Sequence, residues 1–428
     1  MQKPLFLVLF VFFSCTAFFA KAQKNTEIKN YSIIIDGFDW GPAVSKVILP
    51  LDESPENYKA NDFEIFVTRS STDGQIPPTQ SYGKRSIILS YPSDAKGNRL
   101  EEGNHLTLVL AVAPNMPLGS PIQYMRVGNR GGNFWIDYQL QIIHQPSGTI
   151  WNNESERIRP IVDEFDLEGQ FTHQSTTLSY ASWIPEQVEA KIPMIIWLHG
   201  GGEGGTDPTI ALMGNKAFNY ASPEIQALFG GAAVLVPQAP TFWMQASEGM
   251  TRGQTNDIYN EALFALIDDF VKNNPSIDAS RIYVGGCSNG GYMSLKLILE
   301  HPDYFAAGYI SALAYHNQFV SDQQIKEIKN VPIWFVHSKD DQTTKPEETV
   351  VPLYKRLKDA GAKNVVFSYY DNVTDITGFF GGEDFRYNGH WSWIYSHANT
   401  AKTDFDGSQV MMDGKPVTIM EWLAGQKN

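Results

Sequence analysis

The sequence around Ser288 constrains the fold of this chain more strongly than any other segment. Residues 284–292 read VGGCSNGGY and contain the pattern G-x-S-x-G, with a β-type run before it and a helical run after it. A serine on such a tight strand-to-helix turn has a strained backbone, so the glycines on either side let the neighbouring chain pass closely. The turn also lifts the hydroxyl above the sheet, beside the first N–H groups of the helix. Ser288 is therefore our candidate nucleophile.

The length and charge of the chain limit its organisation and its partners. With 428 residues, it is long enough for two domains. Its formal net charge is −14, and no cluster of lysine and arginine stands out. Nucleic acids and anionic membranes are bound through such clusters, so we expect neither as a partner.

Residues 1–22 have the features of a secretory signal peptide. Lys3 precedes an apolar block at residues 5–19, and residues 20–22, AKA, form a cleavage site of the A-x-A type. The block is shorter than the ~20 residues that a membrane-spanning helix needs, so we expect no transmembrane segment. We therefore expect a secreted or periplasmic protein. Removal of the signal would leave Cys287 as the single cysteine, which excludes an intramolecular disulfide.

Residues 23–161 have the pattern of a small all-β domain. Short runs rich in Val, Ile, Tyr and Phe alternate with turn-rich spacers, which is typical of a β-sandwich. The expected strands cover residues 31–35, 44–51, 63–68, 86–91, 105–112 and 134–143. No residue of this domain belongs to a catalytic pattern, and His105 and His144 lack partners at the spacing of metal ligands. The sequence leaves open whether this domain binds glycan or shapes the cleft of its neighbour.

Residues 162–428 have a different rhythm, in which apolar strands alternate with amphipathic helical patterns such as residues 258–271. A linker rich in Pro, Asn and Glu is expected before them, at residues 146–166. The alternation predicts an α/β fold with a doubly wound, mostly parallel sheet. The expected strands cover residues 192–198, 232–236, 281–284, 306–310, 333–336 and 365–369.

A serine nucleophile needs a base, and His390 is the candidate. It lies in NGHWSWIY, after a glycine in a long loop and before a short helix. Such a position leaves the imidazole free to reach across the top of the sheet. A surface histidine packed by Trp391 and Trp393 would have the same local sequence, so this segment alone does not decide between the two interpretations.

The carboxylate that would orient this histidine is expected where the strand in WFVHSKDD, residues 334–341, ends. Carboxylates at the carboxyl end of a parallel strand lie on the same rim as the nucleophile turn. Asp341 is preferred because it follows His337 by four residues, the H-x-x-x-D spacing of related sequences, and Asp340 is the alternative. Either aspartate could instead serve as a turn or helix cap.

Two backbone N–H groups would have to stabilise the oxyanion of a tetrahedral intermediate. One is expected from Asn289, directly after the nucleophile, and the other from Gly201 or Gly202 in LHGGGEGG, residues 198–205. A glycine-rich loop after a strand can also hold phosphate, but no GK[ST] follows here, which argues against nucleotide binding.

Aromatic side chains near these motifs are candidates for the substrate pocket. Trp243, Trp391 and Trp393 would offer flat surfaces to an acyl group or a sugar ring, with Glu203 near the oxyanion loop. The same aromatic residues would suit a hydrophobic core equally well.

Together, these motifs resemble the α/β-hydrolase superfamily, in its branch of secreted esterases, polyhydroxybutyrate depolymerases and prolyl-oligopeptidase-like proteins. The resemblance runs from about residue 165 to the end and includes PQAPTFW at residues 237–243 and HPDYFAA at residues 301–307. In addition, DWGPAV at residues 39–44 resembles the Ig-like domain that precedes the hydrolase in some bacterial secreted esterases.

The resemblance implies Ser288 as nucleophile, Asp341 as triad acid and His390 as general base and then acid. Cys287 departs from the Tyr, Gln or Met of many relatives, and we interpret it as a packing residue. The implied activity is a secreted serine carboxylic-ester hydrolase that uses an acyl-enzyme and no metal or cofactor. Its expected substrates carry acetyl or feruloyl-type groups on carbohydrate or small esters.

A serine peptidase of the prolyl-oligopeptidase type is the alternative activity. The β-rich part of the chain is too short for the multi-bladed propeller that gates such peptidases, which favours the esterase. The sequence does not indicate an oligomeric state.

Overall fold

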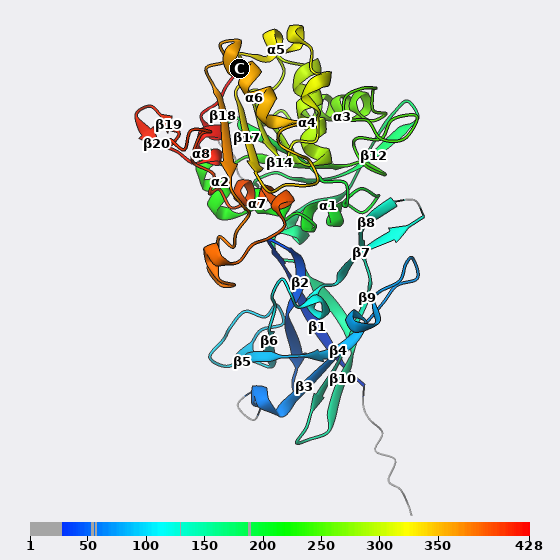
Figure 1. Cartoon of the computed structure of the whole chain (residues 1–428). Coiled ribbons are helices and arrows are strands. Elements are labelled where there is room, and N and C mark those ends of the chain that lie inside the picture. The colour runs from blue at the N-terminus through cyan, green and yellow to red at the C-terminus, as the bar shows by residue number, and fades with distance from the viewer. Residues whose placement is uncertain (1–27, 53–54, 56–57, 129, 187–189) are drawn as a thin grey trace, which may run out of the picture.

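The chain folds into two domains, each built on an eight-stranded sheet (Figure 1). The expected signal peptide, residues 1–22, lies outside the described residues. Within the part of the chain that is described, no helix is both long and apolar enough to cross a membrane. The computed structural model describes residues 28–52, 55, 58–128, 130–186 and 190–428.

The sheet of the N-terminal domain has the strand order β4-β3-β9-β10-β1-β2-β6-β5. β1 pairs with β10 in parallel, and the other neighbours pair antiparallel. The strands cover Ile28–Phe38 (β1), Gly41–Pro50 (β2), Phe63–Ser70 (β3), Tyr82–Arg85 (β4), Ile87–Ser93 (β5), His105–Leu110 (β6), Asp137–His144 (β9) and Thr149–Ile158 (β10).

This sheet curls over a hydrophobic core. In β3, Phe63, Ile65 and Val67 are buried while the residues between them are more exposed, which is the alternation of a strand with one face on a core. Arg85 on the edge strand β4 donates a hydrogen bond of 2.9 Å to the carbonyl of Val44 on β2. Strands that are distant in the sheet order therefore face each other, as in an Ig-like domain.

Two expectations for this domain are wrong in detail. Residues 146–166 are not a linker throughout, because they contain β10, and residues 134–143 are not one strand, because β8 ends at Trp135 and β9 begins at Asp137. The proline and glycine of the supposed linker form the turn between β9 and β10, where Gly148 has φ +71°. The sequence does not reveal β10, because most of its side chains are polar and partly exposed. Backbone pairing holds this strand in the sheet.

The second sheet has the order β11-β12-β14-β13-β15-β16-β17-β18. From β14 to β18 all neighbours are parallel, and the hairpin of β11 and β12 joins antiparallel at one edge. The sequence did not reveal that hairpin. The strands cover Asp166–His173 (β11), Thr176–Trp183 (β12), Ile192–Leu198 (β13), Ala233–Gln238 (β14), Ile277–Cys287 (β15), Ala307–Ser311 (β16), Ile333–Ser338 (β17) and Val365–Tyr370 (β18).

Helices cover both faces of this sheet, which confirms the predicted doubly wound fold. The central strand β13 is buried at every position, and Ile195 and Trp197 pack into a different apolar cluster from Met194 and Ile196. The first cluster contains residues of α1 (Pro208–Met213), α2 (Pro223–Phe229), α7 (Trp393–His397) and α8 (Ile419–Ala424). The second contains residues of α3 (Asn260–Asn273), α4 (Asn289–Glu300), α5 (Asp322–Ile328) and α6 (Val350–Asp359).

A separate hairpin of the N-terminal domain reaches the second domain (Figure 1). It consists of β7 (Ile122–Val127) and β8 (Arg130–Trp135). The indole N–H of Trp135 donates to the Thr209 hydroxyl of α1 at 2.8 Å, and Lys216 forms an ion pair of 3.1 Å with Asp39. A small pair of strands, Met411–Met412 (β19) and Lys415–Pro416 (β20), lies near the C-terminus.

Candidate active site

Ser288 occupies the turn between β15 and α4 with φ +54° and ψ −113°, a conformation that non-glycine residues rarely adopt. A Cβ at Gly290 would overlap the carbonyl oxygen of Leu198, and a Cβ at Gly286 would lie 2.6 Å from the same oxygen. The two motif glycines are therefore required because β13 passes directly beside the turn. Ser288 as a residue is 9% exposed, and it lies on the wall of a cavity.

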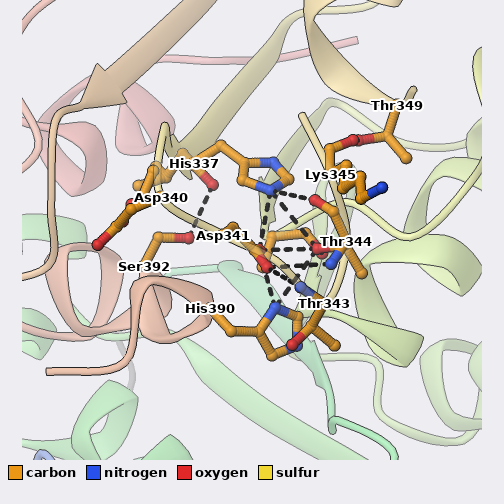
Figure 2. A network of polar contacts seen from close by, with 12 residues as sticks. His337, Asp340, Asp341, Thr343, Thr344, Lys345, Thr349, His390 and Ser392 are labelled. Carbon is orange, nitrogen blue, oxygen red and sulfur yellow. Dashed lines mark hydrogen bonds and ion pairs between the residues drawn. The ribbon is translucent and has the colours of Figure 1, made fainter. Parts of the chain in front are cut away.

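His390 lies beside Asp341, as Figure 2 shows. Nδ1 of His390 is 2.8 Å from Oδ2 of Asp341, and the imidazole is 12% exposed. A carboxylate can only accept, so His390 Nδ1 carries a proton, and in the neutral imidazole Nε2 is the acceptor. The loop before α7 fixes this position, because the Asn388 side chain accepts the His390 N–H at 2.9 Å.

Asp341 is held by several donors in addition to His390. Its Oδ1 accepts the N–H groups of Thr343 and Thr344 at 2.8 and 3.0 Å, and its Oδ2 accepts Nε2 of His337 at 3.0 Å. Burial raises the pKa of the Asp341 carboxyl, but the hydrogen bonds from His337 and His390 outweigh burial and hold the pKa well below its usual range. The group is therefore a carboxylate at neutral pH.

Asp340, the alternative acid, lies in a different environment. Its Oδ1 accepts the hydroxyl of Ser338, and no hydrogen bond joins it to His390 among the described residues. Its carboxyl lies against Gly389, where a side chain would collide with it. The structure thus brings Asp341, and not Asp340, to the imidazole.

Gly201 of the glycine loop lies beside the side chain of Asn289. A Cβ at Gly201 would lie 2.8 Å from Nδ2 of Asn289. Within the described part of the chain, no acceptor binds the N–H groups of Gly201, Gly202 or Asn289, which leaves all three available to a ligand. The Asn289 side chain is occupied elsewhere, because its Oδ1 accepts the Met244 N–H at 3.1 Å.

Ser288, His390, Asn289 and the glycine loop line one cavity of about 710 Å³, a size that suits a small-molecule ligand. Trp391 and Trp393 also line it, as expected from the sequence. Both domains contribute to its wall. The N-terminal domain supplies Asp39, Trp40, Arg69, Gln80, Tyr124, Arg130 and Asn133, among others.

Trp243 does not line this cavity, which corrects the expectation that it belongs to the substrate pocket. Its side chain is fully buried and packs against His199 and Tyr259. The preceding residue, Phe242, faces the cavity instead. The side chains of adjacent residues point in different directions, and the sequence does not tell which of the two is turned inward.

Glu203 lines the cavity but is itself 4% exposed. Its Oε1 accepts a hydrogen bond of 2.7 Å from Nδ2 of Asn133 in the N-terminal domain. Burial raises the pKa of Glu203 to about 7, and hydrogen bonds from Asn133 and nearby backbone amides limit the rise. A carboxyl group that can be protonated near neutral pH therefore lies next to the glycine loop.

Cys287 is fully buried beside the nucleophile, and burial raises the pKa of its thiol well above the usual value. Its Sγ lies 3.7 Å from Oδ1 of Asn215. A buried thiol that stays protonated is a poor nucleophile, which agrees with the packing role expected for this residue.

The contribution of the N-terminal domain is what the sequence did not reveal. Trp40 stacks on Phe38, contacts Phe380 of the second domain edge to face, and lines the cavity. Arg130 and Asn133 lie in β8 and carry no motif. Their role depends on where the hairpin meets a loop about 70 residues later, and no local pattern encodes that contact.

Comparison with protein families agrees with this architecture. Residues 30–152 match the family described as "Esterase Ig-like N-terminal domain", and residues 181–374 match "Phospholipase/Carboxylesterase". A crystal structure titled as that of a thermostable esterase is similar over 94% of this chain and 100% of its own, with a TM-score of 0.72 and 22% sequence identity. That likeness shows a shared fold across both domains.

Curated relatives match a shorter part of the chain. Feruloyl esterase B of Thermothelomyces thermophilus is 26% identical over 145 residues, which cover 33% of this chain and 46% of that protein. A poly(3-hydroxybutyrate) depolymerase of Ralstonia pickettii is 29% identical over 137 residues, which cover 30% of this chain and 26% of the depolymerase. The chain thus spans less than half the length of these two relatives.

The strand order and the shared architecture define the class of fold: a domain with the α/β-hydrolase fold follows an Ig-like domain. The family matches agree with it, since residues 30–152 match a domain that precedes esterases and residues 181–374 match phospholipases and carboxylesterases.

Proposed function

We propose that the protein is a secreted serine carboxylic-ester hydrolase that acts through an acyl-enzyme. Ser288 is the nucleophile, His390 the general base and Asp341 the carboxylate that orients it. The observation that carries the proposal is the 2.8 Å hydrogen bond between His390 Nδ1 and Asp341 Oδ2, with His390 and Ser288 on the wall of one cavity. This arrangement leaves Nε2 as the base for the serine hydroxyl.

Acylation begins when Oγ of Ser288 attacks the ester carbonyl carbon and its proton passes to Nε2 of His390. The carbonyl oxygen becomes negatively charged and would be bound by the N–H of Asn289 and that of Gly201 or Gly202. When the tetrahedral intermediate collapses, the bond to the alcohol breaks and the alcohol leaves with the proton from His390. Asp341 stabilises the imidazolium in between.

Deacylation repeats these steps with water in place of the serine. His390 removes a proton from water, whose oxygen attacks the acyl carbon. The bond to Ser288 Oγ then breaks, and Oγ regains its proton from His390. The products are a carboxylic acid and free enzyme, and no metal or cofactor is needed.

The proposed substrates carry acetyl or feruloyl-type groups on carbohydrate or small esters. The aromatic side chains of Trp40, Tyr124 and Trp391 in the cavity wall support this class, because flat surfaces suit aromatic acids and sugar rings. The similarity to a feruloyl esterase supports it as well. We further propose export directed by residues 1–22, an N-terminal domain over residues 23–161 and a catalytic domain over residues 162–428.

The test compares the purified protein with its Ser288→Ala variant on p-nitrophenyl acetate, methyl ferulate, acetylated xylan and a Gly-Pro anilide. We expect serine-dependent cleavage of at least one ester and an inert anilide. Cleavage of the anilide that disappears with Ser288 would instead assign a peptidase. If both proteins leave every substrate intact and a fluorophosphonate probe does not label Ser288, the proposed nucleophile is wrong.

A further inference from the structure

Most backbone carbonyls of the glycine loop that would bind the oxyanion accept hydrogen bonds from other parts of the protein. Nδ1 of His199 donates to the Gly200 carbonyl at 2.6 Å, since the Nε2 of this imidazole accepts the Ala239 N–H. The Gln238 side chain donates to the carbonyl of Glu203 at 2.8 Å. Both donors belong to the catalytic domain.

The remaining donors come from the other domain, through the hairpin of β7 and β8. The backbone N–H of Asn133 donates to the Gly202 carbonyl at 2.7 Å, and its side chain donates to the carboxyl of Glu203 at 2.7 Å. Arg130 donates to the Gly204 carbonyl at 2.9 Å. Three consecutive loop residues are thus each bound from the N-terminal domain.

Arg130 also joins this loop to a second one. Its guanidinium donates to the carbonyls of Pro240 and Thr241 at 3.2 and 2.8 Å, in addition to Gly204. Gly204 lies so close to the Thr241 carbonyl that a Cβ there would collide with it. The planar guanidinium bridges two backbone segments that approach each other directly.

These contacts determine where the loop amides point. A peptide group is planar, so fixing the Gly200 carbonyl also fixes the N–H of Gly201 on its opposite side. The Gly202 carbonyl shares a peptide group with the Glu203 N–H, so holding this carbonyl fixes that second peptide group. The Gly202 N–H belongs to the peptide group between these two, and its direction is set only when both ends are held. Without the hairpin, this second peptide group would keep only the long hydrogen bond of 3.3 Å from the Glu203 N–H to the Gly200 carbonyl, in a run of glycines, which is the most flexible backbone.

We propose that Asn133 and Arg130 are positioning residues, which hold the loop at residues 200–204 in the geometry that binds the oxyanion. The N-terminal domain is then required for the chemical step. This inference rests on the proposed esterase function. Both residues contact the loop directly, and both also line the cavity.

The test measures kcat and KM of the full chain and of its Asn133→Ala and Arg130→Met variants on a small ester, together with their rates of fluorophosphonate labelling. Loss of one oxyanion donor typically lowers kcat by about 10²- to 10³-fold, so we expect loss of a positioning contact to lower it by about 10- to 100-fold. KM should change by less than about threefold, because ground-state binding does not use the oxyanion. Labelling should slow in parallel, since phosphonylation forms a similar oxyanion.

Two control variants separate positioning from general loss of interface stability. Trp135→Phe removes the hydrogen bond to Thr209 but leaves the glycine loop untouched. Asn153→Ala removes a side-chain hydrogen bond to Asn30, within the N-terminal domain. Both should keep the kcat of the original protein. An equal loss of kcat in Trp135→Phe would overturn the proposal.

A polarity swap keeps the proposal testable even if a truncated variant does not fold. Asn133→Asp alone places two carboxyl groups against each other, whereas Asn133→Asp combined with Glu203→Gln restores one donor and one acceptor. We expect kcat to fall in the single variant and to recover in the double one. If the folded Asn133 and Arg130 variants keep their kcat, or if only KM changes, these residues do not position the loop. The proposed esterase function would still stand in that case. An unmodified protein that cleaves no ester and resists the probe would overturn the proposed function and this inference with it.

Discussion

His337 and His390 donate to the same oxygen of Asp341. Nε2 of His337 lies 3.0 Å from Oδ2, and Nδ1 of His390 lies 2.8 Å from it. His337 is fully buried, and its Nε2 also lies 2.9 Å from the carbonyl of Thr344. Since both of these partners only accept, Nε2 must carry the proton. His337 therefore anchors the carboxylate from within the core, while His390 meets it at the cavity.

Replacing His337 should weaken the site without abolishing it. His337→Phe keeps the ring but leaves Asp341 and the Thr344 carbonyl without this donor, which we expect to lower the free energy of unfolding by about 2 kcal/mol. We expect kcat/KM to fall by about tenfold because Asp341 is less well fixed. His337→Gln offers an amide donor and should lose less of both. Thermal unfolding and ester kinetics on the three proteins check this, and equal behaviour of the two variants would contradict it.

The two neighbouring aspartates should differ sharply on substitution. Asp341→Asn removes the acceptor that fixes the tautomer of His390, and we expect kcat to fall by about 10⁴-fold. Asp340→Asn alters a residue that is bound to Ser338, and we expect kcat to change by less than about threefold. The measurement is kcat at pH 8 for both variants. Comparable losses would mean that the acid has been assigned wrongly.

Asp341→Asn and Asp340→Asn should also differ in how much folding stability they lose at low pH. The pKa of Asp341 is lowered in the folded state, so its contribution to stability is complete above the unfolded pKa of about 4 and is lost as the pH falls through the folded pKa. Asp341→Asn cannot titrate and should therefore show a shallower loss of stability in this range. Denaturant unfolding at pH 3 and pH 6 measures the free energy of unfolding of both variants. An equal loss between the two pH values would contradict this prediction.

Gly290 should tolerate no side chain. A Cβ there would overlap the backbone carbonyl of Leu198, and neither a strand nor a helix start can move aside easily. We expect Gly290→Ala to lower the free energy of unfolding by about 3 kcal/mol or more, or to prevent folding. Gly119→Ala is the control, because its Cβ would meet only ordinary contacts at 3.4 Å and beyond. Similar melting temperatures for the two variants would refute this explanation of the motif.

The parts of the fold that the sequence predicted are those encoded locally. β13 reads as an apolar run because both its faces are buried, and G-x-S-x-G is imposed by the passage of β13 beside the turn. Asp341 was a candidate because it follows a buried strand, and His390 because it follows a glycine in a long loop. Their pairing needed the structure, because 49 residues separate them and Asp340 fits the local pattern as well.

The parts that the sequence missed depend on contacts between distant segments. β10 is polar and pairs through its backbone, so no apolar alternation marks it. Trp243 and Phe242 are adjacent aromatics, and only packing decides which one faces the cavity. Asn133 acts on Glu203 across the domain interface, and nothing near either residue indicates the other.

Glu203 should make stability and activity depend on pH near neutrality. Its folded pKa of about 7 lies above its unfolded value, so the fold favours the protonated form, and stability falls as the pH rises from about 4.5 to 7. The cost above pH 7 is about 3 kcal/mol by this difference in pKa. Glu203→Gln stays neutral and can still accept from Asn133, so we expect its stability relative to the original protein to increase across this range.

Denaturant melts from pH 5 to pH 8 on the original protein and Glu203→Gln measure that increase. Glu168→Gln, at an exposed position, is the matched control and should show no such trend. Above pH 7 the negative charge of the Glu203 carboxylate would also repel the developing oxyanion beside it. The ratio of kcat of Glu203→Gln to kcat of the original protein should therefore increase as the pH rises. A difference between the two proteins that stays constant with pH would mean that Glu203 does not titrate in this range.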